Sequence, residues 1–380
     1  MNIFLASLTT FFVGFFTLPI LIKGLKKMHL LDQPGGRKIH KGQIPSMGGL
    51  AFVPVMLVSG LIWFDSGDLQ ILRYILASLT LMFFVGLRDD MVNLNPYQKL
   101  LGQIVAAVIV VVFADVRLTG FYGFLGIYEF PVWFSYLVSV FSIVALTNAF
   151  NLIDGLDGLA GSIAAVVLSF FAWWFINAGY MAHGMLSAML ASAVAAFLVF
   201  NWHPAKIFMG DTGSLSLGFA LSSFTLLFID INGTVTDDPG YFHFKAPLAM
   251  GILLMIVPIY DTIRVFYRRL RAGKSPFSPD KSHVHHYLLR MGLSHSTVTL
   301  ILSSVLVFFL VLGFIGSNYS DHLMIPIVVV TALSFGWRLD NIVVEKIRKK
   351  VKNSPTRFNQ GKASGLEKIK RDHYFELHDN

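Results

Sequence analysis

The sequence has no cysteine and little charge. Its 380 residues include 0 Cys, and charged residues make up 14% of them, about half of the roughly 25% that soluble domains carry. The missing cysteines exclude a disulfide scaffold, a cysteine-based zinc site, an iron–sulfur cluster and a thiol nucleophile. Hydrophobic residues make up 55%, and the mean hydropathy is +0.65. These values exclude a water-soluble enzyme and predict that lipid surrounds most of the chain.

Long apolar segments follow one another along the chain. A helix that crosses a membrane needs about 20 mainly apolar residues. Together the segments predict an all-α polytopic membrane protein with about 11 transmembrane helices over residues 1–337, followed by a basic tail over residues 338–380. The predicted spans are residues 3–22, 47–64, 69–87, 100–114, 132–149, 159–176, 185–200, 214–229, 246–266, 298–315 and 323–337.

The basic residues indicate how these spans are oriented. Segments that follow the odd-numbered spans share one face of the membrane, and they contain 27 of the 30 Lys and Arg residues. The other face has only Arg73, Arg117 and Lys245. The positive-inside rule therefore predicts an outside N-terminus and a cytoplasmic C-terminal tail. The same distribution accounts for the net charge of +8, so no nucleic-acid partner is predicted.

The unusual polar motifs fall on the predicted cytoplasmic face. Each one follows an odd-numbered span, whereas the outer segments contain only scattered acids. One composite site on this face is the simplest interpretation. The motif residues are Asp89 and Asp90, then Asn151, Asp154 and Asp157, then Asp211, and finally His283, His285 and His286.

The composition of this site indicates its chemistry. Carboxylate and amide oxygens are hard ligands that suit Mg²⁺, with Mn²⁺ as a substitute. Basic residues on the same face, among them Lys41, Lys99, Arg268 and Arg269, suit phosphate oxygens. A metal, several anions and a membrane together predict phosphoryl transfer to or from a lipid.

Each motif also has a purely structural interpretation. Asp89 and Asp90 are compatible with an ordinary charge pair at a helix end, and Asp211 with an N-terminal cap. The glycines between residues 155 and 161 are compatible with close helix packing. The three histidines are compatible with structural zinc, and the arginines between residues 264 and 271 with a positive-inside anchor.

As a set, the motifs resemble the polyprenyl-phosphate N-acetylhexosamine-1-phosphate transferase superfamily, of the glycosyltransferase 4 type. Five blocks occur in the expected order. Val284 interrupts the three consecutive histidines typical of the MraY branch, so the sequence is more similar to the WecA/TagO-like branch. The blocks are Asp32 to Gly49, Asp89 to Lys99, Asn148 to Gly161, Phe208 to Ser214, and His283 to His286.

The resemblance implies a reaction and a role for each motif. Polyprenyl phosphate, of undecaprenyl type, would accept an N-acetylhexosamine 1-phosphate from a UDP-sugar, most simply UDP-GlcNAc, and UMP would leave. Asn151 and Asp211 would contact Mg²⁺, and Phe208 would stack on uracil. The remaining residues implied for the nucleotide, the phosphates and catalysis are Asn201, Lys41, Lys99, Arg268, Arg269, Asp89, Asp90, Asp154, Asp157, His283, His285 and His286.

Other functions are compatible with parts of this pattern. An MraY-like transferase of phospho-MurNAc-pentapeptide is the nearest alternative, and a secondary transporter is the alternative from another class, because carboxylates at membrane depth also mark ion pathways. A CDP-alcohol phosphatidyltransferase is disfavoured because its Asp-Gly-x-x-Ala-Arg motif is missing. The resemblance implies an inner-membrane enzyme with a cytoplasmic active site, and a homodimer is compatible with it. The tail is expected either to lie against anionic lipid or to be soluble and disordered.

Overall fold

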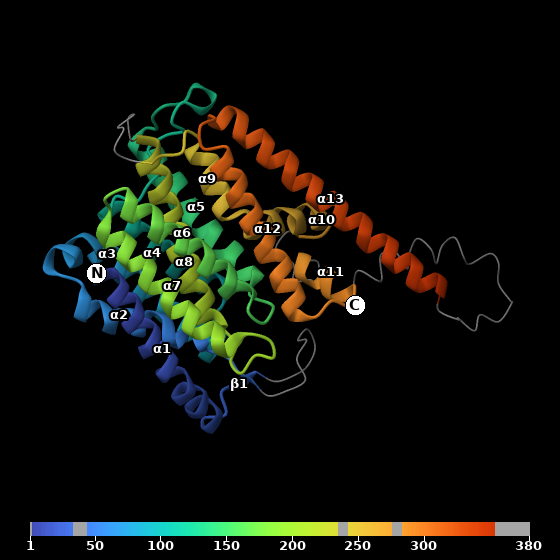
Figure 1. Ribbon diagram of the computed structural model, residues 1–380, viewed down its shortest axis with the longest axis horizontal. Coiled ribbons are helices and arrows are strands. Elements are labelled where there is room, and N and C mark those ends of the chain that lie inside the picture. Colours follow the sequence, from blue (N-terminus) through green and yellow to red (C-terminus); the bar gives the residue numbers. More distant parts are fainter. Residues whose placement is uncertain (1, 33–43, 235–241, 276–282, 354–380) are drawn as a thin grey trace.

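The protein is a bundle of α-helices (Figure 1). The computed structural model describes residues 2–32, 44–234, 242–275 and 283–353. Two short antiparallel strands, β1 and β2, pair with each other, with Leu31 opposite Pro45 and Asp32 opposite Ile44. The elements are α1 (Asn2–Lys27), β1 (Leu31–Asp32), β2 (Ile44–Pro45), η1 (Gly48–Ala51), α2 (Phe52–Trp63), α3 (Ser66–Val92), α4 (Pro96–Phe113), η2 (Phe124–Gly126), α5 (Val132–Ile153), α6 (Leu159–Asn177), α7 (Met181–Asn201), α8 (Gly210–Thr234), α9 (Pro247–Leu254), α10 (Ile256–Arg271), α11 (Val284–Arg290), α12 (His295–Ile315) and α13 (Asp321–Asn353).

The helices confirm the all-α polytopic membrane fold. In the part of the chain that is described, nine helices are long and apolar enough to cross a membrane. A tenth span results if α9 and α10, which bend by 78° at their junction, are taken together. The predicted span at residues 47–64 is the short apolar helix Gly48–Trp63. All eleven predicted segments are therefore helical, but eleven full spans are not confirmed, and the orientation of the termini stays a prediction.

Helix α8 lies at the centre of the bundle. In its most apolar stretch 89% of the residues are buried, compared with 22% in α1. It packs against α3 and α5 (Figure 1). Small residues allow this close approach, and several of its hydroxyl groups bond within the helix: Ser216 donates to the Thr212 carbonyl and Ser222 to the Gly218 carbonyl. Most of the polar side chains of this buried helix are thereby satisfied without water.

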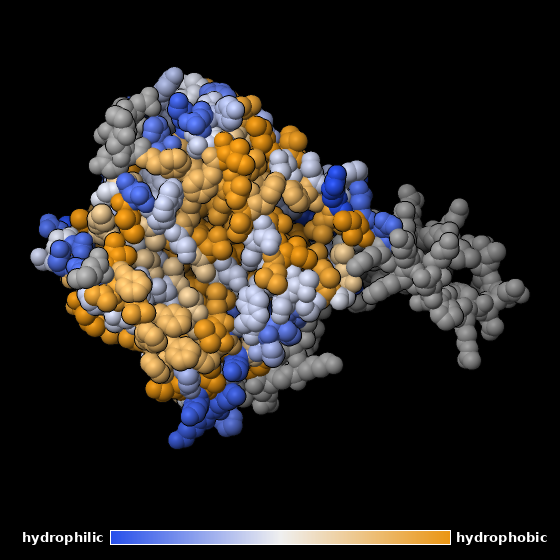
Figure 2. Space-filling view, in the orientation of Figure 1, coloured by the Kyte–Doolittle hydropathy of each residue, from blue (hydrophilic) through white to orange (hydrophobic). Residues whose placement is uncertain are grey.

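The outer surface of the bundle is largely apolar. Figure 2 shows hydrophobic side chains over the middle of the visible face and hydrophilic ones mainly towards its ends. Phe4, Phe16 and Ile20 on α1 are between 64% and 71% exposed. An apolar surface of this size would be unfavourable in water. It is suited to contact with lipid tails, as the apolar composition predicts.

The broken helix pair α9–α10 is held by α13. The Asp321 carboxylate accepts hydrogen bonds from the backbone N–H groups of Leu248 (3.4 Å) and Ala249 (2.8 Å). These are donors that the first turn of α9 cannot satisfy within its own helix. The bend at Met255 directs α10 towards α11 and α12, where the candidate site lies.

Candidate active site

Two glycines hold the loop that precedes α8. The N–H groups of Gly48 and Gly49 donate to the carbonyls of Phe208 (2.7 Å) and Met209 (2.9 Å). A side chain on Gly49 would place its Cβ 2.0 Å from the backbone nitrogen of Gly213. Only glycine allows two backbones to approach so closely. The Gly48-Gly49 motif therefore fixes where α8 begins.

The Asp90 carboxylate caps the N-terminus of α8. It accepts the N–H of Asp211 (2.8 Å), the N–H of Thr212 (2.8 Å) and the hydroxyl of Thr212 (2.5 Å). Gly210 approaches the carboxylate with a φ of +73°, and a Cβ there would lie 2.7 Å from Asp90 Oδ2. Three donors on one carboxylate satisfy otherwise unpaired N–H groups of the helix. The contacts of Asp90 therefore orient Asp211.

Asp211 lies at the centre of a polar network. Its Oδ1 accepts hydrogen bonds from Lys99 Nζ (2.6 Å) and Asn151 Nδ2 (2.8 Å). Lys99 Nζ also lies 2.8 Å from Asp89 Oδ2, and Asn151 donates to the Ser214 hydroxyl at 2.7 Å. One ammonium thus lies between two carboxylates from different helices. Side chains that are far apart in the sequence converge here as predicted.

The network opens into a polar cavity of about 530 Å³. Asp154 follows α5 at its rim, half-buried. Burial, and then the charges of Asp211, Asp90 and Asp157, raise the pKa of the Asp154 carboxyl to about 8. A carboxyl group crowded by other carboxylates requires a cation to stay ionised at neutral pH. The cavity is lined by Ser46, Asp89, Asp90, Asn93, Asn151, Asp154, Gly155, Leu156, Asp157, Asn201, Phe208, Met209, Gly210, Asp211, Ser214, His286 and His295.

Asp157 is paired with histidines. Its Oδ2 lies 2.6 Å from His203 Nδ1 and 3.5 Å from His295 Nδ1. Burial by itself would raise the pKa of Asp157, but the two neighbouring histidines, His295 and His203, outweigh it and lower the pKa below its ordinary value. Asp157 therefore stays ionised at neutral pH, in contrast to Asp154.

Asn201 joins two loops of the site. Its Oδ1 accepts the N–H of Gly158 at 2.9 Å, and its Nδ2 donates to the Ile207 carbonyl at 2.9 Å. Only 5% of the residue is exposed. Asn201 thereby holds the loop after α5 against the loop that leads to Phe208, and a direct contact with a substrate stays a prediction.

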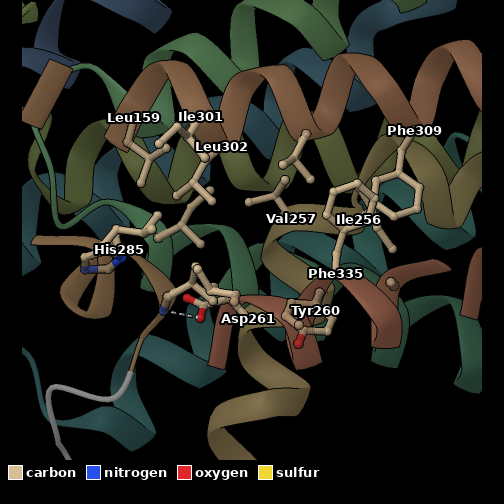
Figure 3. Close-up of a pocket in the computed structure, with 17 residues that line it drawn as sticks. Leu159, Ile256, Val257, Tyr260, Asp261, His285, Ile301, Leu302, Phe309 and Phe335 are labelled. Atoms are coloured by element: carbon tan, nitrogen blue, oxygen red, sulfur yellow. Dashed lines mark hydrogen bonds between the residues drawn. The ribbon is translucent and has the colours of Figure 1, made fainter. Parts of the chain in front are cut away.

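The three histidine rings lie close together, with centroids 4.3 to 6.3 Å apart, but their surroundings differ. His283 Nδ1 bonds to Asp261 Oδ2 at 2.8 Å, and the same carboxylate accepts the Val284 N–H at 2.8 Å (Figure 3). His285 lines an apolar cavity, whereas His286 lines the polar one. The rings of His285 and His286 are nevertheless only 4.3 Å apart, so neighbouring positions of α11 line the two cavities.

The apolar cavity adjoins this histidine segment. It has a volume of about 200 Å³ and lies among α10, α11, α12 and α13 (Figure 3). Asp261 and His285 are its main polar groups, and Figure 3 shows aliphatic and aromatic side chains around them. It is lined by Ile153, Leu159, Ile256, Val257, Tyr260, Asp261, Val284, His285, Leu288, Ile301, Leu302, Val305, Phe309, Ala332, Phe335, Gly336 and Leu339.

Two of the predicted phosphate-binding arginines lie away from the polar cavity lining. The guanidinium of Arg268 lies over the Tyr287 ring, 4.8 Å from its centroid, beside that of Arg264. Arg269 is 6% exposed. Neither Arg268 nor Arg269 lines the polar cavity as the described residues define it, so their substrate role stays a prediction. Lys41 lies outside the described residues.

Comparison with known proteins assigns the chain to a family. Residues 72–229 match the model of glycosyl transferase family 4. The chain is 35% identical over 316 residues, 83% of its own length and 82% of the relative's, to a probable undecaprenyl-phosphate N-acetylglucosaminyl 1-phosphate transferase of Bacillus subtilis (strain 168). The chain belongs to glycosyl transferase family 4. A decaprenyl-phosphate N-acetylglucosaminephosphotransferase of Mycobacterium leprae is 32% identical over 78% of this chain and 79% of the relative. An undecaprenyl-phosphate alpha-N-acetylglucosaminyl 1-phosphate transferase of Yersinia pestis is 27% identical over 89% and 92%.

The glycosyl transferase family 4 match covers most, though not all, of the polar cavity. It includes most of α8 and the segments that carry Asp89, Lys99, Asn151 and Asp211. It ends before α11, so the histidine segment joins the cavity from outside the matched region. The carboxylate network thus lies within the matched region and the histidine segment outside it, and the roles of these residues stay predictions.

Three residues that contact the predicted site residues were not among the sequence-based candidates. His203 and His295 contact Asp157, and Asp261 pairs with His283. Asp261 had a usable signal, because an acid inside an apolar span is normally paired or functional. His203 and His295 had none, since isolated histidines outside a motif carry no positional information.

The buried His285 imidazole predicts a pH-dependent stability. Burial, followed by the nearby charge of His286, lowers its pKa to about 3, compared with about 6.5 in an unfolded chain. Between these values the unfolded chain binds a proton that the folded chain does not. The free energy of unfolding therefore falls as the pH drops below about 6.5, by about 2 kcal/mol from this group at pH 5.

Thermal unfolding of the detergent-solubilised protein between pH 7.5 and 5 tests this expectation. The His285→Gln variant should lose stability less steeply than the wild type as the pH falls. Gly24→Ala, which removes no titratable group and whose added Cβ meets no heavy atom within 4 Å, is the control and should keep the wild-type slope. An unchanged slope in His285→Gln would contradict the prediction.

Proposed function

We propose that the protein transfers N-acetylglucosamine 1-phosphate from UDP-GlcNAc to a polyprenyl phosphate at the cytoplasmic face of the inner membrane. An oxygen of the lipid phosphate attacks the β-phosphorus of UDP-GlcNAc. The bond between this phosphorus and the oxygen bridging to the α-phosphorus breaks, and UMP leaves with that oxygen. Family membership and the names of the relatives support this reaction. The observation that carries it is the polar carboxylate cavity beside an apolar cavity, with α11 lining both.

The donor set fits a Mg²⁺ ion. Asp211, Asn151 and Asp154 offer hard oxygen atoms around one cavity, which is the chemistry that Mg²⁺ or Mn²⁺ prefers. Asp154, crowded by other carboxylates, lacks a cationic partner among the described residues. When bound there, the ion would neutralise phosphate charge and orient the diphosphate.

The chain's own residues then divide the remaining tasks. Lys99, held between Asp89 and Asp211, brings a positive charge to the place where like-charged phosphates must meet. Asp90 positions Asp211 through the N-terminus of α8. Asp89 accepts the Leu94 N–H at 2.8 Å and so holds Lys99 in place.

Deprotonation of the acceptor is a minor requirement in this mechanism. A phosphate monoester has a second pKa of about 6, so it is largely ionised at neutral pH without a protein base. The contacts of Asp90 are used for positioning, and Asp89 is paired with Lys99. We therefore infer that Asp90 positions its neighbours and that Asp89 balances the charge of Lys99, and that neither carboxylate is needed to remove a proton.

The lipid tail requires an apolar environment next to the polar site. The cavity among α10, α11, α12 and α13 provides one, and the bend between α9 and α10 directs α10 along it. Burying isoprenyl groups there stabilises the complex by about 25 cal/mol per Å² of apolar surface. The tail would enter from the bilayer while its phosphate reaches the polar cavity.

Release of UMP tests the proposed function. Purified protein, a polyprenyl phosphate and Mg²⁺ are expected to release UMP from UDP-GlcNAc and to form the lipid diphospho-sugar, as detected by mass spectrometry. EDTA should abolish the reaction, and Mg²⁺ should restore it. UDP-GalNAc, UDP-QuiNAc and a UDP-MurNAc-pentapeptide serve as competing donors. No UMP from any donor, in a preparation shown to be folded, would overturn the transferase function.

A further inference from the structure

Three side chains from distant parts of the sequence meet at the rim of the polar cavity. They are Asp157 in the loop after α5, His203 in the loop after α7, and His295 at the start of α12. Each offers one ligand atom, and these atoms lie within 4.8 Å of one another. Among the described residues this is the only such group of three or more His, Asp and Glu side chains.

The details of this group suit a transition-metal ion. The rings of His203 and His295 lie 4.8 Å apart with a tilt of 32°, so both Nδ1 atoms face Asp157. His295 Nδ1 is buried and lacks a well-formed hydrogen bond. A buried ring nitrogen without such a bond is costly, and a cation would satisfy it. The His203 side chain is 39% exposed, which gives an ion access from solvent.

The ligand chemistry distinguishes this group from the magnesium site. Two imidazoles and one carboxylate form a nitrogen-rich set, which Zn²⁺ prefers, whereas Mg²⁺ prefers oxygen alone. Zinc–nitrogen and zinc–oxygen bonds are about 2.0–2.2 Å long. The Asp157–His203 and Asp157–His295 separations of 2.6 and 3.5 Å require only small side-chain movements to accept the ion.

We propose that Asp157, His203 and His295 form a second metal site, which binds Zn²⁺ and is separate from the magnesium site at Asp211. Three protein ligands leave a fourth position open to water. The ion would tie together the loop after α5, the loop after α7 and the start of α12. Because Asp157 and His295 line the polar cavity, a bound ion would also withdraw Asp157 from any nucleotide.

A consequence that rests on the proposed function is inhibition by zinc. Zn²⁺ should inhibit sugar-phosphate transfer in the presence of excess Mg²⁺, at the concentration at which it binds. The His203→Ala variant should require at least about 100-fold more Zn²⁺ for the same inhibition. If the protein shows no transferase activity, zinc inhibition cannot be measured. The zinc-binding measurement described next then tests the metal site independently of the proposed function.

Binding of the metal alone tests the site. Isothermal titration of the full chain in detergent with Zn²⁺ is expected to show one ion per chain. Co²⁺ should give the visible absorption of a four-coordinate nitrogen and oxygen site. His203→Ala and His295→Ala should each weaken binding at least about 100-fold, since even an outer-shell partner is worth about 10–100-fold. His295→Gln serves as a second variant if His295→Ala does not fold.

Two controls separate this site from its neighbours. Asp211→Asn should retain zinc binding because it alters only the magnesium site. His286→Gln, which removes a histidine from the same cavity, should also retain it. The proposal is overturned if the folded wild type binds no stoichiometric zinc. It is equally overturned if His203→Ala and His295→Ala bind as tightly as the wild type.

Discussion

The Asp211→Asn substitution is expected to reduce turnover at least about 1,000-fold while the fold is retained. The loss follows because a neutral amide is a poor Mg²⁺ ligand and leaves the developing phosphate charge without its counter-ion. The fold should persist because the side-chain oxygen can still accept from Lys99 and Asn151. The backbone N–H still donates to Asp90, so α8 keeps its cap.

The measurement is UMP release across a Mg²⁺ titration, together with thermal unfolding. Higher Mg²⁺ should not restore the variant to the wild-type rate. Asp115→Asn is the matched control, because the Asp115 side chain is 71% exposed and pairs with Arg117 away from the cavity. It should stay within about twofold of the wild type, as surface ion pairs are worth little. Normal turnover in Asp211→Asn would remove Asp211 from the metal site.

The Gly86→Ala substitution is expected to displace the start of α8. The added Cβ would lie 2.6 Å from the Asp211 carbonyl oxygen and 2.6 Å from Thr212 Cα. Both neighbours are backbone atoms, so no side-chain rotation relieves the overlap. Overpacking of this kind costs about 1–3 kcal/mol. A shift of about 1 Å in a catalytic group reduces turnover by about 100-fold.

Gly24 provides a close control for Gly86. It also lies inside a helix, α1, but a Cβ added to Gly24 would meet no heavy atom within 4 Å. Gly24→Ala should therefore be neutral or stabilising by about 0.5–1 kcal/mol, because alanine has the higher helix propensity. Thermal unfolding and UMP release are measured for both variants. Equal behaviour of the two would show that the contact between α3 and α8 does not position Asp211.

The bundle explains why a membrane enzyme of this kind needs its most protected helix at the centre. Asp211 is at the N-terminus of α8, held by Asp90 from α3 and by the turn at Gly48 and Gly49. Position errors in such a site are small because the main neighbours of Asp211 are anchored in packed helices or in the tight turn at Gly48 and Gly49. The lipid-facing helices α1 and α13 contribute none of the described residues that line the polar cavity.

The one-sided distribution of charge predicted that the polar motifs lie close together. Asp89, Asn151, Asp154 and Asp211 were expected together because they follow spans that end on one face, and they line one cavity. This inference works because lipid excludes charge, so charged residues collect at span ends. The three histidines were assigned one shared role, although their spacing of two and one residues does not place all three on one helical face. α11 directs His285 into the apolar cavity and His286 into the polar one.

Segment length and hydropathy by themselves determined that this chain is a helical membrane protein, because each span must satisfy its own backbone hydrogen bonds in lipid. They did not determine the bend between α9 and α10, the role of Asp90 as a cap, or the meeting of Asp157 with His203 and His295. Those features depend on contacts between residues up to 138 positions apart in the sequence. Only the packing of the helices decides such contacts, since the local pattern around each residue is compatible with several partners.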